Sequence, residues 1–329
     1  MKTPVLILFG PTASGKTEVL TKLFGGGSSG GRRAAEIISS DSMQVYRGMD
    51  IGTAKPSAEE QARIPHHLID IRNPDQQFNA GEFVRLAEEV ALAAADRGAL
   101  PVVSGGTGFY LKNLVQGLGQ APPADHRLRA ALAEELASRG AAALAEELRQ
   151  ADPVSAGRIH INDEYRLLRA LEVYRLTGRP LSSFASPWSA AGFSADGRPF
   201  RFLLIGLRWN REALYRRINA RTAAMFRSGL SAEVRRLYEA GYSPADPALK
   251  AIGYREFFVP VVDGEGGTGG WRLSEDNAGV QALVAQNSRR YAKRQITFFA
   301  SLPGVTWVDC GDGVDAASSV ERALEDFLR

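Results

Sequence analysis

The chain has few of the residues that crosslink proteins or bind transition metals. Its 329 residues include one cysteine, Cys310, and four histidines, of which only His66 and His67 are close in sequence. This count excludes a disulfide within the chain and any cluster with zinc-ligand spacing, and a reducing cytoplasm is the expected compartment. No apolar run approaches the roughly 18 residues needed to cross a bilayer. We therefore expect no membrane partner.

The first apolar run, residues 5–9, is short and leads into Gly10 and Pro11 without a cleavage pattern. A buried strand is therefore expected there, and not a signal peptide. Hydrophobic residues make up 44% of the chain and charged residues 23%, which excludes a disordered chain. The length predicts about two domains, or one domain with an insertion.

The net charge of +3 says little, but positive charge is unevenly distributed. Residues 198–236 contain ten arginines against two acids. Such a segment suits a polyanionic partner such as nucleic acid. Solvated helix faces would explain it equally well.

Apolar runs bounded by turn residues alternate with helical patterns along most of the chain. Strands are expected at residues 4–9, 37–40, 67–71, 100–103 and 202–207. This alternation predicts an α/β fold with a parallel sheet and flanking helices. After the fifth strand we expect two helices within 211–240, interrupted near Gly229, and a long helix across 277–301. Glycine-rich loops are expected at 25–31 and 264–270.

Residues 121–199 break the alternation. Two amphipathic helices are expected at 125–138 and 141–150, separated at Gly140, and a third begins at an Asn162 cap and ends at Gly178. This segment reads as a helical insertion between two strands of the sheet. We therefore predict a core formed by residues 1–120 and 200–329, with a helical domain at 121–199.

The clearest motif is GPTASGKT, which directly follows the first expected strand and precedes a helix. Its glycines permit a tight turn whose backbone N–H groups, together with the helix N-terminus, hold phosphate oxygens. Lys16 can neutralise the phosphates, and the Thr17 hydroxyl can bind Mg²⁺, the expected cofactor. The expected diphosphate-binding residues are Gly10, Thr12, Ala13, Ser14, Gly15, Lys16 and Thr17. The motif predicts a bound diphosphate or triphosphate without identifying the reaction.

Two acids could complete a phosphate site. Asp41 follows the second expected strand and Asp70 the third, and either could hold Mg²⁺ in a kinase or a triphosphate hydrolase. Asp41 should lie at the carboxyl edge of the sheet, where it could act as a general base. A helix cap or a turn residue is the alternative for Asp41. A second glycine turn, 105–108, brings the Thr107 hydroxyl to the same edge, unless its glycines serve only the turn.

Eight sequence blocks, in order, resemble the tRNA dimethylallyltransferase (isopentenyl-tRNA transferase) family of bacterial type. They are GPTASGKT (10–17), SSDSMQVYRGMDIGTAKP (39–56), PHHLIDI (65–71), GGTGFYL (105–111), DPVSAGRIHINDEYRLLRALEVY (152–174), RINAR (217–221), AIGYRE (251–256) and YAKRQITFF (291–299). The resemblance covers nearly the whole chain. It implies a P-loop NTPase-like parallel sheet with an inserted all-helical subdomain.

The family transfers a dimethylallyl group from dimethylallyl diphosphate to the exocyclic N6 of adenosine at tRNA position 37. By this resemblance, Thr107 and Arg221 contact the diphosphate, and Asp41 accepts the proton from N6. The inserted helices would clasp the anticodon stem, and a monomer is expected. The positions that match tRNA contacts of the family are Asp41, Ser42, Met43, Gln44, Gly108, Tyr165, Arg166, Arg169, Lys250, Gly253, Tyr254, Arg255, Arg289, Arg290, Lys293 and Arg294.

Three other functions compete with this interpretation. An adenylate dimethylallyltransferase would be shorter and would not need the helical insertion. A small-molecule kinase built on the same phosphate loop would not explain the segment 39–56. An RNA-binding protein without catalysis would not need Lys16, Asp41 and Arg221 together.

Overall fold

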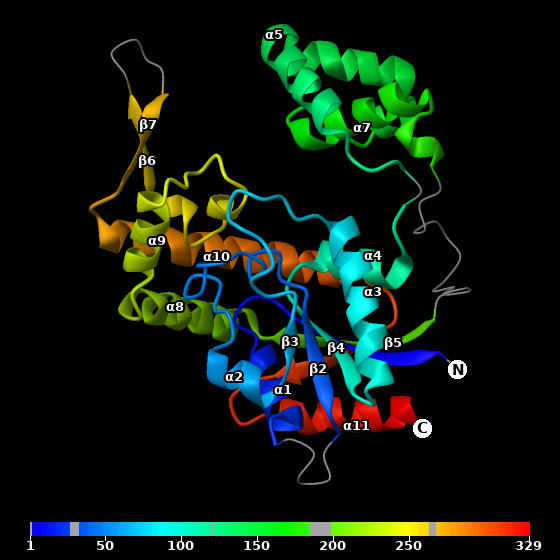
Figure 1. Ribbon diagram of the computed structural model, residues 1–329, viewed down its shortest axis with the longest axis vertical. Helices are drawn as coiled ribbons and strands as arrows, with labels where there is room; N and C mark the ends of the chain where they lie inside the picture. Colours follow the sequence, from blue (N-terminus) through cyan, green and yellow to red (C-terminus); the bar gives the residue numbers. More distant parts are fainter. Residues whose placement is uncertain (1, 27–32, 120, 185–198, 263–267) are drawn as a thin grey trace. The chain divides into compact units, whose positions relative to one another are not determined.

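The computed structural model describes residues 2–26, 33–119, 121–184, 199–262 and 268–329. The chain separates into two compact units, one formed by Met1–Val115 with Ala195–Arg329 and the other by Gln116–Ser194 (Figure 1). Both divisions fall within a few residues of the boundaries expected from the sequence. The two units are described separately below.

The larger unit is built on a six-stranded sheet in which neighbouring strands are parallel. Its strands, in the order β3-β2-β4-β1-β5-β8, are β3 (His66–His67), β2 (Ala35–Ser39), β4 (Leu100–Gly105), β1 (Thr3–Phe9), β5 (Phe200–Trp209) and β8 (Val305–Cys310). The predicted α/β class is confirmed, and each of the five expected strands is present. β3 is shorter than expected because Leu68 and Asp70 have φ angles of 64° and 56°, which end an extended strand.

Helices cover both faces of the sheet (Figure 1). The larger unit contains α1 (Lys16–Phe24), α2 (Ala58–Arg63), α3 (Ala80–Asp96), α4 (Gly108–Gln116), α8 (Arg211–Arg227), α9 (Leu230–Glu239), α10 (Asn277–Phe299) and α11 (Ala316–Leu328). Side chains alternate along β1, so that Ile7 and Phe9 pack with residues of α3 and α4, while Leu6 and Leu8 pack with residues of α1 and α11. None of the helices in the described part of the chain is long and apolar enough to span a membrane.

The order of the strands brings together the three loops that follow β1, β2 and β4. The chain runs from β1 to β2 and then returns to β4, which lies between them. Phe9 pairs with Gly105, and Ser39 pairs with Ser104, so the carboxyl ends of these strands are adjacent. In parallel sheets such a change of direction opens the crevice in which ligands bind.

Loops were expected at the two glycine-rich segments, and for residues 264–270 this expectation was partly wrong. β6 (Phe258–Val262) and β7 (Thr268–Leu273) form an antiparallel hairpin, so Gly269 and Gly270 belong to a strand. Pairing with β6 satisfies backbone groups there that an exposed loop would leave to water. Residues 263–267, and 27–32 of the other glycine-rich segment, lie outside the described residues. The break near Gly229 is confirmed, since this residue separates α8 from α9 with a φ of 98°.

The smaller unit is helical, as expected. It contains α5 (His126–Ala151), α6 (Pro153–Ala156) and α7 (Glu164–Thr177). Gly140 interrupts α5 with a φ of 80°, and Gly178 ends α7 with a φ of 68°. Asp163 caps α7 by accepting a hydrogen bond from the Arg166 N–H, so the cap is one residue later than expected. The buried core residues are Leu132, Leu144, Leu148, Leu167, Ala170 and Leu171.

Candidate active site at the carboxyl edge of the sheet

A cavity of about 720 Å³ opens at the carboxyl edge of the sheet in the larger unit. The phosphate loop lines it through residues 12–17, and the loop after β2 lines it through residues 41–44. The second glycine turn contributes Gly105 and Gly106, while Arg217, Arg221, Tyr291 and Gln295 come from α8 and α10. The structure therefore brings the separate sequence motifs around one space.

The phosphate loop adopts a tight turn. Ala13 and Gly15 have φ angles of 64° and 87°, values that turn the backbone between β1 and α1. Gly10 does not line the cavity, but a Cβ there would lie 2.6 Å from Ser14 Oγ, so only glycine allows this close approach. Lys16 Nζ curls back and donates hydrogen bonds to the carbonyls of Gly10 and Pro11 at 3.0 and 3.2 Å.

Three side chains distant in sequence hold this loop. Trp209 Nε1 donates to the Ser14 carbonyl at 3.0 Å, Arg217 Nε donates to the Ala13 carbonyl at 2.9 Å, and Gln295 Oε1 accepts from the Thr12 N–H at 3.0 Å. The Arg217 guanidinium also lies 4.5 Å from the centre of the Trp209 ring, within cation–π distance. None of the three was predicted as a site residue, although Arg217 and Gln295 fall inside the RINAR and YAKRQITFF blocks.

Asp41 is a turn residue, and its carboxylate also lines the cavity. Its Oδ1 accepts hydrogen bonds from the backbone N–H groups of Met43 at 2.8 Å and Gln44 at 3.4 Å, as a turn residue does. Its Oδ2 receives no hydrogen bond from the residues that the structure describes, and the residue lines the cavity. One carboxylate oxygen is therefore structural, and the other is available to a ligand.

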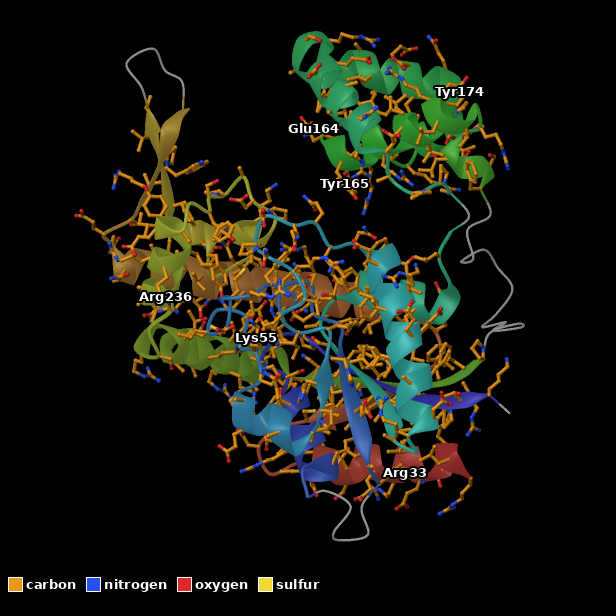
Figure 2. The ribbon with its side chains drawn as sticks, viewed as in Figure 1. Arg33, Lys55, Glu164, Tyr165, Tyr174 and Arg236 are labelled. Carbon is orange, nitrogen blue, oxygen red and sulfur yellow. The ribbon has the colours of Figure 1, made fainter. Side chains whose placement is uncertain are left out.

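Asp70, the other candidate acid, is committed to an ion pair. Lys55, whose side chain is only 4% exposed, is labelled in Figure 2. Its Nζ lies 2.5 Å from Asp50 Oδ1 and 2.6 Å from Asp70 Oδ1, and it donates to the Tyr46 carbonyl at 3.0 Å. Of the two candidate acids, Asp41 lines the cavity and Asp70 does not.

Two cations face Asp41 in the cavity. Burial and the positive charge of Arg221 lower the pKa of Lys16 to about 8, against an opposing effect of Asp41. Burial also lowers the pKa of Arg221, and Asp41 again acts in the opposite direction. Two partly desolvated cations beside one acid form a site that favours a bound anion.

We expect the affinity for inorganic diphosphate without metal to report the charge of Lys16. Lys16 is protonated below a pKa of about 8 and loses its charge as the pH rises through this value. Binding should therefore weaken about tenfold more between pH 7 and pH 9 in the wild type than in Lys16→Arg, which stays charged. Calorimetric titration of both proteins measures this, and the shared titration of diphosphate cancels in the comparison. Equal slopes would assign the proton to another group.

Thr107 lies beside the cavity and not among its lining residues. Its hydroxyl accepts a hydrogen bond from the Ser42 N–H at 3.0 Å and donates to Ser42 Oγ at 3.3 Å. It thus joins the second glycine turn to the loop that carries Asp41. To donate to diphosphate, as expected from the resemblance, this hydroxyl would have to turn its hydrogen away from Ser42 Oγ, while it could still accept from the Ser42 N–H.

The residues expected to contact tRNA divide into several groups. Ser42, Met43, Gln44, Lys250, Gly253, Arg255 and Arg294 line the cavity together with Asp41. Arg290 and Lys293 are exposed on α10, whereas Arg289 Nη1 donates to Asn219 Oδ1 at 2.6 Å. A Cβ at Gly108 would lie 2.4 Å from the Phe298 ring, so this glycine serves the packing of α4 against α10.

For the Tyr254 side chain the structure corrects the expectation. It is completely buried, and its hydroxyl donates to Glu233 Oε1 at 2.6 Å. The same carboxylate accepts hydrogen bonds from the N–H groups of Asp50, Ile51 and Gly52. Tyr254 therefore stabilises the wall of the site and does not present its side chain to a partner.

In the helical unit, Tyr165 projects from the first turn of α7 (Figure 2) and is 70% exposed. The Arg129 guanidinium lies 5.2 Å from the centre of its ring. Arg166 is also exposed and pairs with Asp163 at 3.2 Å. Arg169 is different, because it pairs at 2.7 Å with the fully buried Glu172 and so stabilises the unit itself.

The donor set fits Mg²⁺ held together with a substrate. No cluster of three or more His, Cys, Asp or Glu side chains able to hold a metal is present in the described part of the chain. Thr17 is exposed at the start of α1 and lines the cavity. A single hydroxyl is sufficient for Mg²⁺, which keeps several waters and takes phosphate oxygens as ligands.

Residues 44–302 match the family model described as IPP transferase. Among curated proteins, the chain is 45% identical over 319 residues to a tRNA dimethylallyltransferase of Geobacter sulfurreducens, covering 97% of this chain and 96% of the relative. A second relative, tRNA dimethylallyltransferase 1 of Syntrophotalea carbinolica, is 42% identical and covers 94% and 91%.

Solved structures show the same likeness. A tRNA Δ2-isopentenylpyrophosphate transferase of Staphylococcus epidermidis is 36% identical with a TM-score of 0.65, covering 99% of both chains. A eukaryotic dimethylallyltransferase described as acting on tRNA is 24% identical with a TM-score of 0.77, covering 99% of this chain and 79% of its own, and it supports the fold alone. By its sequence match along nearly its whole length, the chain belongs to the tRNA dimethylallyltransferase family.

Proposed function

We propose that this protein transfers a dimethylallyl group from dimethylallyl diphosphate to the exocyclic N6 of adenosine at position 37 of tRNA, releasing diphosphate. The observation that carries the proposal is the cavity itself. The phosphate loop, the two cations Lys16 and Arg221, and Asp41 all line it, and the charges of these three side chains influence one another. Family membership identifies the class of reaction for which this arrangement is suited.

In the proposed reaction the N6 lone pair attacks the allylic carbon while the bond from that carbon to the diphosphate oxygen breaks. Asp41 Oδ2 accepts the proton that N6 loses. Lys16, Arg221 and the loop amides stabilise the negative charge that develops on the departing diphosphate, the type of stabilisation that usually contributes most. An exocyclic amine is a weak nucleophile, so its alignment with the leaving group matters as much as the base.

The Thr17 hydroxyl would hold Mg²⁺ together with diphosphate oxygens. When bound, the ion would neutralise charge on the leaving group. The described residues contain no cluster of three or more His, Cys, Asp or Glu side chains able to hold a metal, so diphosphate oxygens and waters would supply most of the remaining ligands.

The acceptor adenine must leave the anticodon-loop stack to reach the cavity, which costs less in a single-stranded loop than in a duplex. Exposed cations on α10, Arg290 and Lys293, and the rim residues Lys250, Arg255 and Arg294 would contact the anticodon stem-loop. Tyr165 and Arg166 of the helical unit would add contacts to the stem. Asp41, the phosphate loop and Arg221 come from one chain, so we propose that the protein works as a monomer. We also propose that it works in the cytoplasm, the compartment expected from its single cysteine.

Radiolabelled dimethylallyl diphosphate offered with unmodified tRNA, AMP or ATP tests the function. We expect label on tRNA alone, at position 37 after nuclease digestion. Label on AMP would indicate an adenylate dimethylallyltransferase. Release of γ-phosphate from ATP without any transfer would indicate a kinase-like enzyme, and tRNA binding without transfer to any acceptor would contradict catalysis.

A further inference from the structure

Gln295 joins the two glycine turns of the site through one side-chain amide. Its Oε1 accepts from the Thr12 N–H of the phosphate loop at 3.0 Å, and its Nε2 donates to the Gly106 carbonyl of the second glycine turn at 2.8 Å. The residue is 6% exposed.

The chemistry of this bridge is demanding. The side chain must accept from one loop and donate to the other, which an amide does and a carboxylate or an ammonium group does not. The fit is also tight, since a Cβ at Gly106 would lie 2.4 Å from Gln295 Nε2. The amide therefore sets both the separation of the turns and the direction of one loop N–H.

That direction affects how the loop binds phosphate. The Thr12 N–H points to Gln295 and is not free for a ligand. Without Gln295 the Thr12 peptide could rotate, and the amides that follow it in the loop would change direction with it. Gln295 lies on the same helix as the exposed cations Arg290 and Lys293, so it also connects the phosphate loop to the helix proposed to contact tRNA.

We propose that Gln295 is a positioning residue, which holds the phosphate loop at the spacing from the second glycine turn that the diphosphate leaving group requires. In this role it acts through the backbone of Thr12 and Gly106. The proposal rests on the proposed function for the identity of the ligand. Its test therefore uses inorganic diphosphate binding as well as transfer.

The informative variant is Gln295→Glu. A protonated glutamic acid can accept from Thr12 and donate to Gly106, whereas the ionised form cannot donate and adds a negative charge beside the phosphate loop. We expect its Kd for Mg²⁺-diphosphate to be about tenfold above that of the wild type at pH 8. Burial at this position raises the pKa of the introduced carboxyl above that of a free glutamate, so at pH 5.5 we expect it to gain its proton and the ratio to fall toward one.

Two further variants complete the experiment. Gln295→Met keeps the side-chain length without either hydrogen bond, so we expect about tenfold weaker binding at both pH values and a lower kcat for transfer at saturating tRNA. Gln286→Glu makes the same charge change at an exposed position of α10 and should bind diphosphate like the wild type at both pH values. The Kd for tRNA should stay within about twofold in every variant at pH 8.

The outcomes separate the two proposals. Wild-type diphosphate affinity and kcat in Gln295→Met, or a pH-independent defect in Gln295→Glu, would overturn the positioning role. A wild-type protein that binds diphosphate but transfers nothing to tRNA would contradict the proposed function, while the pH-dependent rescue would still decide the role of Gln295.

Discussion

Asp41→Asn should lower kcat for dimethylallyl transfer by roughly 10² to 10⁴, the range associated with loss of a general base. The substitution keeps Oδ1, which accepts hydrogen bonds from Met43 and Gln44, so the turn should persist. It replaces the available Oδ2 with an amide that cannot take a proton. Single-turnover transfer with saturating tRNA and dimethylallyl diphosphate measures the effect.

The affinity of Asp41→Asn for inorganic diphosphate shows whether a lower kcat comes from the lost base or from a damaged site. Removing a negative charge near Lys16 and Arg221 should leave the affinity for inorganic diphosphate unchanged or somewhat tighter. Asp70→Asn is the matched control, because Asp70 was the other candidate acid and is paired with Lys55. We expect its kcat to stay within a few-fold of the wild type. Equal losses in both variants would contradict the assignment of Asp41.

Glu233→Ala should destabilise the larger unit by about 4 kcal/mol or more. Glu233 is 1% exposed and accepts four hydrogen bonds, from three consecutive backbone N–H groups at residues 50–52 and from the Tyr254 hydroxyl. Its removal leaves the buried Tyr254 hydroxyl and three part-buried N–H groups without their acceptor, and a fully buried donor left unpaired costs about 1–3 kcal/mol. Urea denaturation followed by tryptophan fluorescence gives the change in unfolding free energy.

Two further variants serve as references for the change in unfolding free energy of Glu233→Ala. Tyr254→Phe removes a single donor and should cost about 1 kcal/mol. Glu239→Ala, at an exposed position of the same helix, should change stability by less than about 0.5 kcal/mol. A Glu233→Ala midpoint close to that of Glu239→Ala would show that water replaces the carboxylate. Since Gly52 lines the cavity, we also expect Glu233→Ala to lose activity.

The sequence predicted those parts of the site that depend on local pattern. A glycine turn between a strand and a helix can be read from neighbouring residues, as can a polar residue that follows a strand. The residues that hold the loop could not be read this way, because Trp209, Arg217 and Gln295 lie 195, 204 and 283 residues from their partners. The choice between Asp41 and Asp70 likewise depended on the three-dimensional position of Lys55, which pairs with Asp70. The sequence around neither acid indicates this pair.

Three strands, β6, β7 and β8, were not predicted, and the reason again lies in contacts that a local pattern does not show. β8 has only one fully buried residue, Val308, so its sequence VTWVDC shows no continuous apolar run. β6 and β7 form a separate two-stranded sheet, in which Val261 and Val262 are exposed and glycines occupy two of the six positions of β7. Pairing, not composition, makes these segments extended.

The distant contacts of the phosphate loop also determine when the site is formed during synthesis. Residues 10–17 leave the ribosome early, whereas α10 emerges only when nearly all of the chain has been made, and domains generally fold as units in the order of synthesis. A nascent chain that ends before residue 277 carries the entire GPTASGKT motif but not the Gln295 contact that fixes it. We expect such a chain to bind diphosphate more weakly than the full chain, because the Thr12 N–H lacks the acceptor that orients the loop.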